Sequence, residues 1–122
     1  MVPDGPVINF SLPMFAESGF KKWELRGREG HYISSNRIDV IDFVLLIYSG
    51  DERRLVETTI ESSGAELTID PSRAFGESAI VITGSRFRME GQQWSWDGAE
   101  RVIKIDRAAR VVFSEEIGSI LR

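Results

Sequence analysis

The sequence has no cysteine and a single histidine among its 122 residues. Without cysteine, neither a disulfide framework nor a thiolate metal site can form. With His31 as the only histidine, a three-histidine metal centre is excluded as well. We expect His31, in the polar stretch at residues 28–31, to lie on the surface without a catalytic role. The sequence predicts no cofactor.

Other absences narrow the function further. There is no G-x-x-x-x-G-K-[ST] loop for nucleotide phosphates, no G-x-S-x-G nucleophile elbow, and no pair of carboxylates that stands out among the 19 acidic residues. We therefore expect that the protein is not an enzyme. The net charge of -4 and the pI near 5.0 argue against nucleic acid as a partner. No apolar run approaches the roughly 20 residues of a membrane-spanning helix.

The feature that is present throughout is an apolar alternation with a period of two, which is typical of β-strands. It is strongest at residues 36–48. The alternation predicts one face with Ile38, Val40, Val44, Leu46 and Tyr48, and an opposite face with Ile41, Phe43, Leu45 and Ile47. Because the second half is apolar on both faces, we expect a central strand that is covered on both sides or that meets a partner.

Turn residues divide the chain into about eight to ten short strands. We expect turns at residues 49–52, 62–64, 70–72 and 97–98, a bulge or corner at Gly91, and a weak helical tendency at residues 115–122. This pattern predicts an all-β fold of the sandwich, jelly-roll or barrel type. Residues 1–19 are expected to form an N-terminal extension or a first edge strand, and residues 20–122 a single domain.

Two tryptophans in the stretch "MEGQQWSWDG" are the clearest candidates for a functional surface. Trp94 and Trp96 lie two residues apart, so both indole rings share one face of a strand about 7 Å apart. Packed against Ile103 and Ile105 across a hairpin, they would belong to the core. Exposed, they would form a hydrophobic or stacking surface for acyl chains or sugars. The sequence leaves both interpretations open.

Three stretches carry a family resemblance that runs over residues 20–113. They are "WELRGREGHYI", "NRIDVIDFVLLIYSGDERRLVETTIESSGAELT" and "GESAIVITGSRFRMEGQQWSWDGAERVIKIDRAARVVF". In their alternating strands, charged turns and hairpins, they resemble the periplasmic lipopolysaccharide-export proteins of the LptC/LptA (OstA-like) family. The resemblance implies an open antiparallel β-jellyroll, a stack of strands that forms a V-shaped sheet sandwich. The membrane-anchored members of that family begin with an N-terminal transmembrane helix, which this chain lacks.

The resemblance also implies a function and a location. The chain would bind lipopolysaccharide or another glycolipid without enzymatic chemistry and transfer it during outer-membrane assembly. It would join other β-jellyroll transport components through edge strands in the periplasm, and it would reach the inner membrane only through an anchoring segment absent here. Arg26, Arg28, Arg86 and Arg88 would line a local basic rim. The implied apolar groove is lined by Trp23, Leu25, Val40, Val44, Leu46, Ile60, Leu67, Ile80, Ile82, Phe87, Met89, Trp94, Trp96, Ile103 and Ile105.

Two alternatives remain open beside lipid transport. In a carbohydrate-binding jelly roll, Trp94 and Trp96 would be exposed and would stack on sugar rings. In a scaffold domain, an unpaired edge strand would bind another protein by strand addition.

Overall fold

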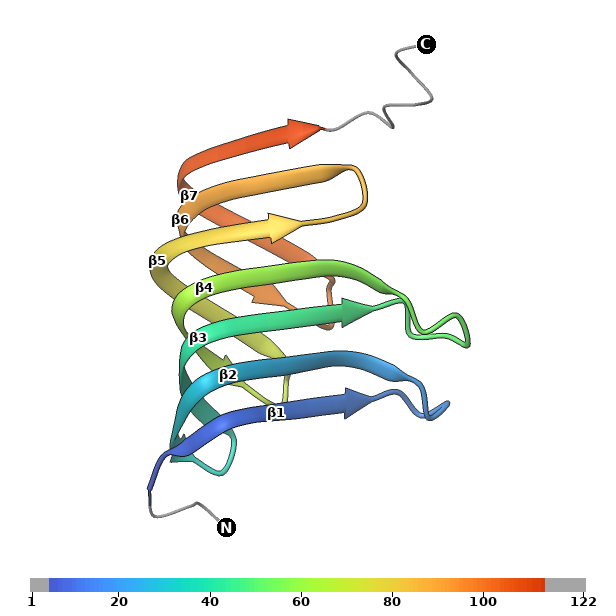
Figure 1. The fold of residues 1–122 in the computed structure, drawn as a ribbon, viewed down its shortest axis with the longest axis vertical. Coiled ribbons are helices and arrows are strands. Elements are labelled where there is room, and N and C mark those ends of the chain that lie inside the picture. The colour runs from blue at the N-terminus through green and yellow to red at the C-terminus, as the bar shows by residue number, and fades with distance from the viewer. Residues whose placement is uncertain (1–4, 114–122) are drawn as a thin grey trace.

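The structure is a computed structural model that describes residues 5–113. These residues form seven strands and no helix, so the all-β expectation is confirmed. All seven strands join one antiparallel sheet in the order of the chain (Figure 1). The strands are β1 (Val7–Phe15), β2 (Lys21–Ser34), β3 (Arg37–Tyr48), β4 (Val56–Thr68), β5 (Arg73–Thr83), β6 (Phe87–Asp97) and β7 (Val102–Phe113). Within this part of the chain, no helix has the length and hydropathy that a membrane span requires.

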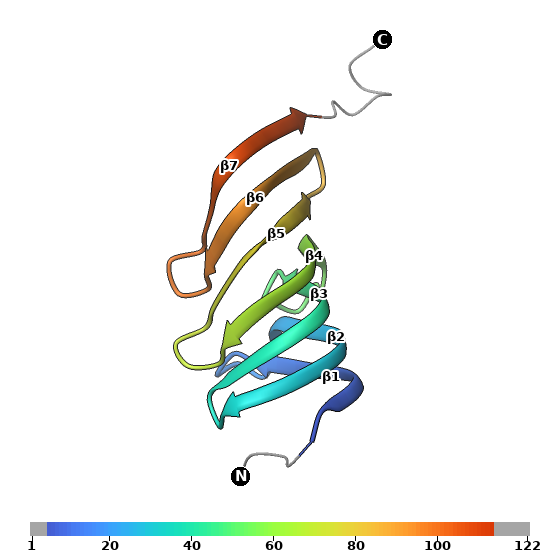
Figure 2. The ribbon, with the colours of Figure 1, turned by 90° about the vertical axis from the view of Figure 1, so that its left-hand side faces the viewer.

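The sheet is folded along a line that crosses every strand, so that it forms an open V (Figure 1). Figure 2 shows the same sheet from the closed side of the V, with the strands stacked from β1 to β7. We call the two halves the first and the second leaf. The first leaf contains residues 10–15, 21–27, 43–48, 56–62, 79–83, 87–91 and 109–113. The second leaf contains residues 7–8, 29–34, 37–41, 64–68, 73–76, 94–97 and 102–106.

Single residues with left-handed backbone conformation produce the bend in four of the strands. They are Asn9 in β1, Asp42 in β3, Gln93 in β6 and Ala108 in β7, with φ angles of 48°, 58°, 57° and 53°. Such a residue adds one position to the alternation, so that side chains three positions apart fall on the same face. The inner face of the sheet therefore continues through the corner without interruption.

The corners explain why seven strands are present where the turn pattern predicts eight to ten. The expected turn at residues 62–64 is wrong, because these residues form a bend inside β4. A bend and a turn attract the same small and polar residue types, since both interrupt the regular ladder. The expected turns at residues 49–52, 70–72 and 97–98 are confirmed as connections between strands. The pairing register also shifts next to Gly91, where a bulge or corner is expected.

The predicted faces of residues 38–48 are wrong beyond Asp42. Leu45 pairs with Leu25 and Ile60, and all three side chains are fully buried on the inner face. Val44 and Leu46 lie on the outer face, where Val44 pairs with Arg26 and Glu61 and Leu46 pairs with Glu24 and Thr59. The cause is the left-handed residue Asp42, which brings both Val40 and Phe43 to the inside.

The hydrophobic core lies between the two leaves. Its fully or nearly fully buried members come from β2 to β6, and β1 and β7 contribute partly buried side chains at the two ends. The buried set is Trp23, Leu25, Ile38, Val40, Phe43, Leu45, Ile60, Leu67, Ala74, Ile80, Ile82, Trp94 and Trp96. The helical tendency predicted for residues 115–122 lies outside the described residues.

Candidate functional site

The inner surface of the V holds most of the residues predicted from the sequence to line a groove. Buried on it are Trp23, Leu25, Val40, Ile60, Leu67, Ile80, Ile82, Trp94 and Trp96. Phe87, Met89, Ile103 and Ile105 pack against them and are partly exposed. Val44 and Leu46 are not on this surface, as described above.

The sequence interpretation missed several inner residues. In β3 these are Phe43, Leu45 and Ile47, and in β1 they are Phe10, Leu12 and Met14. The spacing of two in "FSLPM" is a signal that would have found the β1 residues. No pattern marks the change of face in β3, because the residues on both sides of Asp42 are equally apolar.

Aromatic rings join the two leaves across the interior of the V. The rings of Trp23 in the first leaf and Trp96 in the second are perpendicular, with centroids 6.0 Å apart. Phe43 in the first leaf and Trp94 in the second are 5.6 Å apart. Each such pair is worth about 0.5–1.5 kcal/mol beyond the area it buries. These contacts hold the leaves together along the middle of the groove.

The position of the two tryptophans bears on the alternatives that the sequence left open. Trp94 and Trp96 share the inner face and lie opposite Ile105 and Ile103, and their exposed fractions are 2% and 4%. Neither ring is an exposed platform on which a sugar could stack. The indole Nε1 of Trp94 has no hydrogen-bond partner within residues 5–113, whereas Nε1 of Trp23 donates to Ser72 Oγ at 3.3 Å.

A cavity of about 430 Å³ opens between the tips of the two leaves, and we call it the mouth cavity. Its floor contains Trp23 and Ile47 from the first leaf and Trp96 and Ile103 from the second. The connections β3–β4 and β6–β7 form its rim. A volume of this size is in the range of sites that bind small organic ligands.

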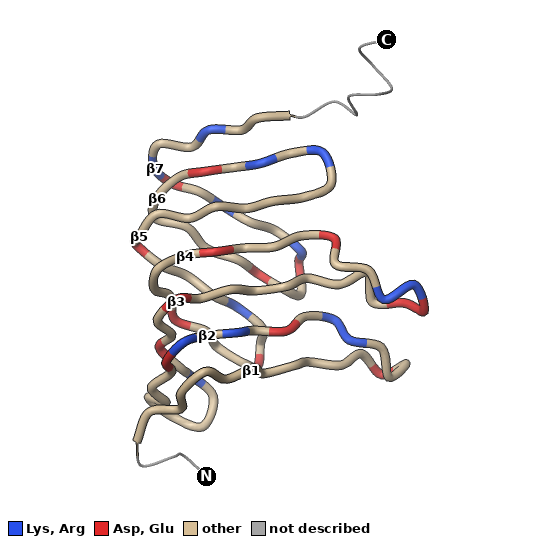
Figure 3. Tube along the Cα trace, viewed as in Figure 1, with Lys and Arg blue, Asp and Glu red and all other residues tan. Residues whose placement is uncertain are grey.

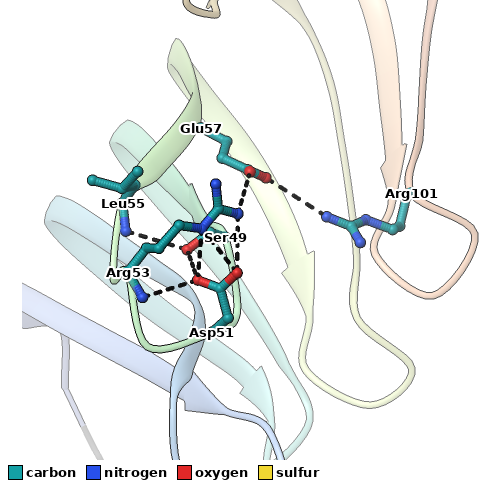
Figure 4. Close-up of polar contacts among 6 residues, drawn as sticks. All are labelled: Ser49, Asp51, Arg53, Leu55, Glu57 and Arg101. Carbon is teal, nitrogen blue, oxygen red and sulfur yellow. Dashed lines mark hydrogen bonds and ion pairs between the residues drawn. The ribbon is translucent and has the colours of Figure 1, made fainter.

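Charged side chains span the mouth cavity (Figure 4). The carboxylate of Glu57 at the start of β4 lies 3.8 Å from the guanidinium of Arg101 in the β6–β7 connection and 3.7 Å from that of Arg53. Arg53 also binds Asp51, and this ion pair, together with the hydroxyl of Ser49, lowers the pKa of Asp51 to about 2. The Glu57–Arg101 pair connects the tips of the two leaves.

Away from the mouth cavity, charged residues are spread along the strands of both leaves (Figure 3), and several of them form short ion pairs on the outer face. Glu24 is almost fully buried there between Lys21 and Arg26, at 2.6 and 2.8 Å, and these two cations lower its pKa. Arg28 binds Asp42 at the corner at 2.6 Å. His31 is exposed and lies 2.6 Å from Glu29.

The expected basic rim is therefore wrong. Arg26, Arg28 and Arg88 face away from the interior of the V. Each forms an ion pair with an acidic neighbour, as Arg88 does with Glu90 at 2.9 Å. Arg86 lies in the exposed β5–β6 connection, and none of the four lines the mouth cavity. Alternation in the strands decides the outward direction, because the neighbours Leu25 and Met89 face inward.

The inner surface remains open at the end formed by β6 and β7. Phe87 and Met89 lie opposite Phe113 and Val111, and these last two side chains are 76% and 49% exposed. In the described part of the chain, β7 pairs only with β6, and its other edge is unpaired. An apolar inner wall and an unpaired strand edge thus meet at the same end of the sheet.

A comparison with protein families finds one that fits this architecture. The family described as "Lipopolysaccharide-assembly, LptC-related" matches residues 6–114, which is nearly the whole chain. A search of curated proteins found no match. The fold and the extent of the match agree with the resemblance seen in the sequence, and the chain belongs to the LptC-related family of lipopolysaccharide-assembly proteins.

Proposed function

We propose that the protein binds lipopolysaccharide, or a related amphiphile, between its two leaves and passes it on during outer-membrane assembly without an enzymatic step. Membership of a lipopolysaccharide-assembly family supports a role in lipopolysaccharide transport. The observation that carries the proposal is the continuous apolar inner surface, which reaches solvent at the mouth cavity and at the β6–β7 end.

Binding of acyl chains to such a surface is favourable because it removes the chains from water. Each buried methylene contributes about 0.8 kcal/mol, whatever the details of the contact. The groove needs no specific polar groups for this part of the binding. Its lining is therefore suited to saturated chains of differing length rather than to one defined small molecule.

The centre of the V is closed by the aromatic contacts between the leaves. Chains that occupy the whole groove have to part Trp23 from Trp96 and Phe43 from Trp94, which are 6.0 and 5.6 Å apart at their centroids. The bends make this movement feasible, because the ladder is already irregular there and the leaves are joined through single residues. In this proposal the ligand enters where the inner face is already accessible.

The unpaired edges offer a route to the next carrier. A strand edge with free N–H and C=O groups can be extended by a strand of another protein. On β7 this edge adjoins Val111, Val112 and Phe113, all exposed. We propose that another β-jellyroll transport component pairs with it in the periplasm, so that two inner surfaces join into one. β1 is the opposite edge and contains Pro13, which cannot donate a ladder hydrogen bond.

A crosslinking experiment tests the groove. A photo-crosslinking amino acid is placed at Ile47 and Ile103, which line the mouth cavity, and at their outward-facing sequence neighbours Leu46 and Lys104. The protein is expressed in cells that make lipopolysaccharide, irradiated, and probed for attached glycolipid. We expect adducts at Ile47 and Ile103 and none at the two neighbours.

The paired positions make the result decisive, because the inward and the outward site of each pair are adjacent residues of the same strand. Equal adduct yields on both faces, or adducts on neither face in a folded protein, would contradict the proposal. Adducts to a protein and not to glycolipid at Ile103 would instead favour a scaffold domain.

A further inference from the structure

Two cations line a cavity whose floor is apolar, and this combination is what an amphiphile with an acidic headgroup requires. Lys22 at the start of β2 and Arg101 in the β6–β7 connection come from opposite leaves and both line the mouth cavity. Trp23, Trp96 and Ile103 lie beside them in the same cavity. Among residues 5–113, Glu57 is the only acidic residue of the lining.

These two cations are weakly engaged compared with those of the outer face. The pair between Arg101 and Glu57 is 3.8 Å long and includes no hydrogen bond, while the side chain of Arg101 is 71% exposed. Lys22 forms no ion pair with any residue from 5 to 113. By contrast, Arg28 is paired at 2.6 Å. Guanidinium and ammonium groups with unused N–H donors bind phosphate and carboxylate oxygens readily.

We propose that Lys22 and Arg101 form a headgroup site that binds the phosphate or carboxylate of an acidic amphiphile. In the absence of ligand, the carboxylate of Glu57 is paired with Arg101, and the anionic group of the ligand displaces it. The inference rests on the proposed function, since the chains of the same ligand would lie on the apolar floor. Arg53, 3.7 Å from Glu57, retains the displaced carboxylate. Binding then exchanges one anion for another and leaves no charge unpaired.

The site also explains how ligand binding is connected to the opening of the V. The Glu57–Arg101 pair is the contact between charged groups of the two leaf tips at the mouth (Figure 4). Replacing Glu57 with the ligand removes that connection at the moment the headgroup arrives. The aromatic contact between Trp23 and Trp96 on the cavity floor is then what the entering chains have to part.

The test compares three probes with the purified protein by titration calorimetry: decyl phosphate, decanol and inorganic phosphate. We expect decyl phosphate to bind about threefold to fivefold more tightly than decanol, which is the effect of one partly exposed ion pair. Arg101→Gln and Lys22→Gln should each remove most of this preference. Glu57→Gln should strengthen decyl phosphate binding about twofold to threefold, because the competing anion is gone.

Arg88→Gln is the matched control, since Arg88, like Arg101, is an exposed and ion-paired arginine but lies on the outer face. It should keep the full preference. Equal affinity for decyl phosphate and decanol, unaffected by Arg101→Gln, overturns the headgroup site and leaves the apolar groove intact. Absence of binding by both chain-bearing probes overturns the groove and the headgroup site together. Inorganic phosphate that binds as tightly as decyl phosphate would show a site for the free anion and overturn the headgroup assignment.

Discussion

Truncating two adjacent leucines tests the change of face in β3, on which the composition of the groove depends. Leu45 is fully buried between Leu25 and Ile60, which are themselves fully buried. Leu→Ala substitutions at such sites cost about 2–5 kcal/mol, because the cavity cannot collapse completely. Since Leu45 lies under the closed centre of the V, we expect Leu45→Ala to lower the free energy of unfolding by about 3 kcal/mol.

Leu46 provides the matched comparison because it is the next residue of β3 and faces the opposite side of the sheet. It is half-buried and lies between Glu24 and Thr59 on the outer side, where water can fill the space left by truncation. Leu46→Ala should lower the free energy of unfolding by about 1 kcal/mol, close to the loss of transfer energy alone. Domains of this size have about 5–15 kcal/mol of stability, so both variants remain folded.

Urea-induced unfolding followed by tryptophan fluorescence measures both variants. With a slope of about 1.5 kcal/mol per molar urea, the midpoint should fall by about 2 M for Leu45→Ala and by less than about 1 M for Leu46→Ala. If Leu46→Ala were as destabilising as Leu45→Ala, or more so, the inner face would not change at Asp42. The groove would then be lined by Val44 and Leu46 after all.

Two further predictions concern the bend and the outer face. At Asp42, where φ is 58°, Asp42→Val should be about 1–2 kcal/mol less stable than Asp42→Gly in urea unfolding, because a β-branched residue tolerates left-handed backbone poorly. Both variants lose the ion pair with Arg28, so its loss does not contribute to the difference. Equal stability would show that the bend does not depend on this conformation. For Glu24, whose pKa is lowered from 4.5 mainly by the hydrogen bond from Lys21, the unfolded state takes up the proton first as the pH falls. The stabilising contribution of Glu24 is complete above pH 4.5 and is lost as the pH falls below it. Between about pH 6 and pH 3, the urea midpoint should therefore fall more steeply in the wild type than in Glu24→Gln. Parallel plots of the midpoint against pH for the two proteins would refute this assignment.

The sequence contains enough information for the fold class and for most of the strands. A period of two, combined with turn residues at 49–52, 70–72 and 97–98, correctly predicts an antiparallel all-β chain. The pairing of Trp94 and Trp96 on one face, opposite Ile105 and Ile103, also follows from spacing alone. These features are local, so short stretches of sequence determine them.

Apart from the corner expected at Gly91 in β6, the bends could not be predicted, because left-handed backbone at Asp42, Gln93 and Ala108 has no common residue signature. The bend in β3 was therefore missed, and the bend in β4 was mistaken for a turn. The mouth site was hidden for a different reason. Lys22 and Arg101 are far apart in the chain, and only the closing of the V brings them to one cavity.

The strict order of the strands has a consequence for how the chain folds and how it can change in length. Every strand pairs only with its neighbours in sequence, so the sheet grows by adding one hairpin to the last without long loops to close. Proteins whose contacts are local fold faster than β-sandwiches with distant pairings. A duplication or loss of two adjacent strands would lengthen or shorten the V by a fixed step while leaving each remaining corner unchanged, as in solenoid proteins that are extended one unit at a time.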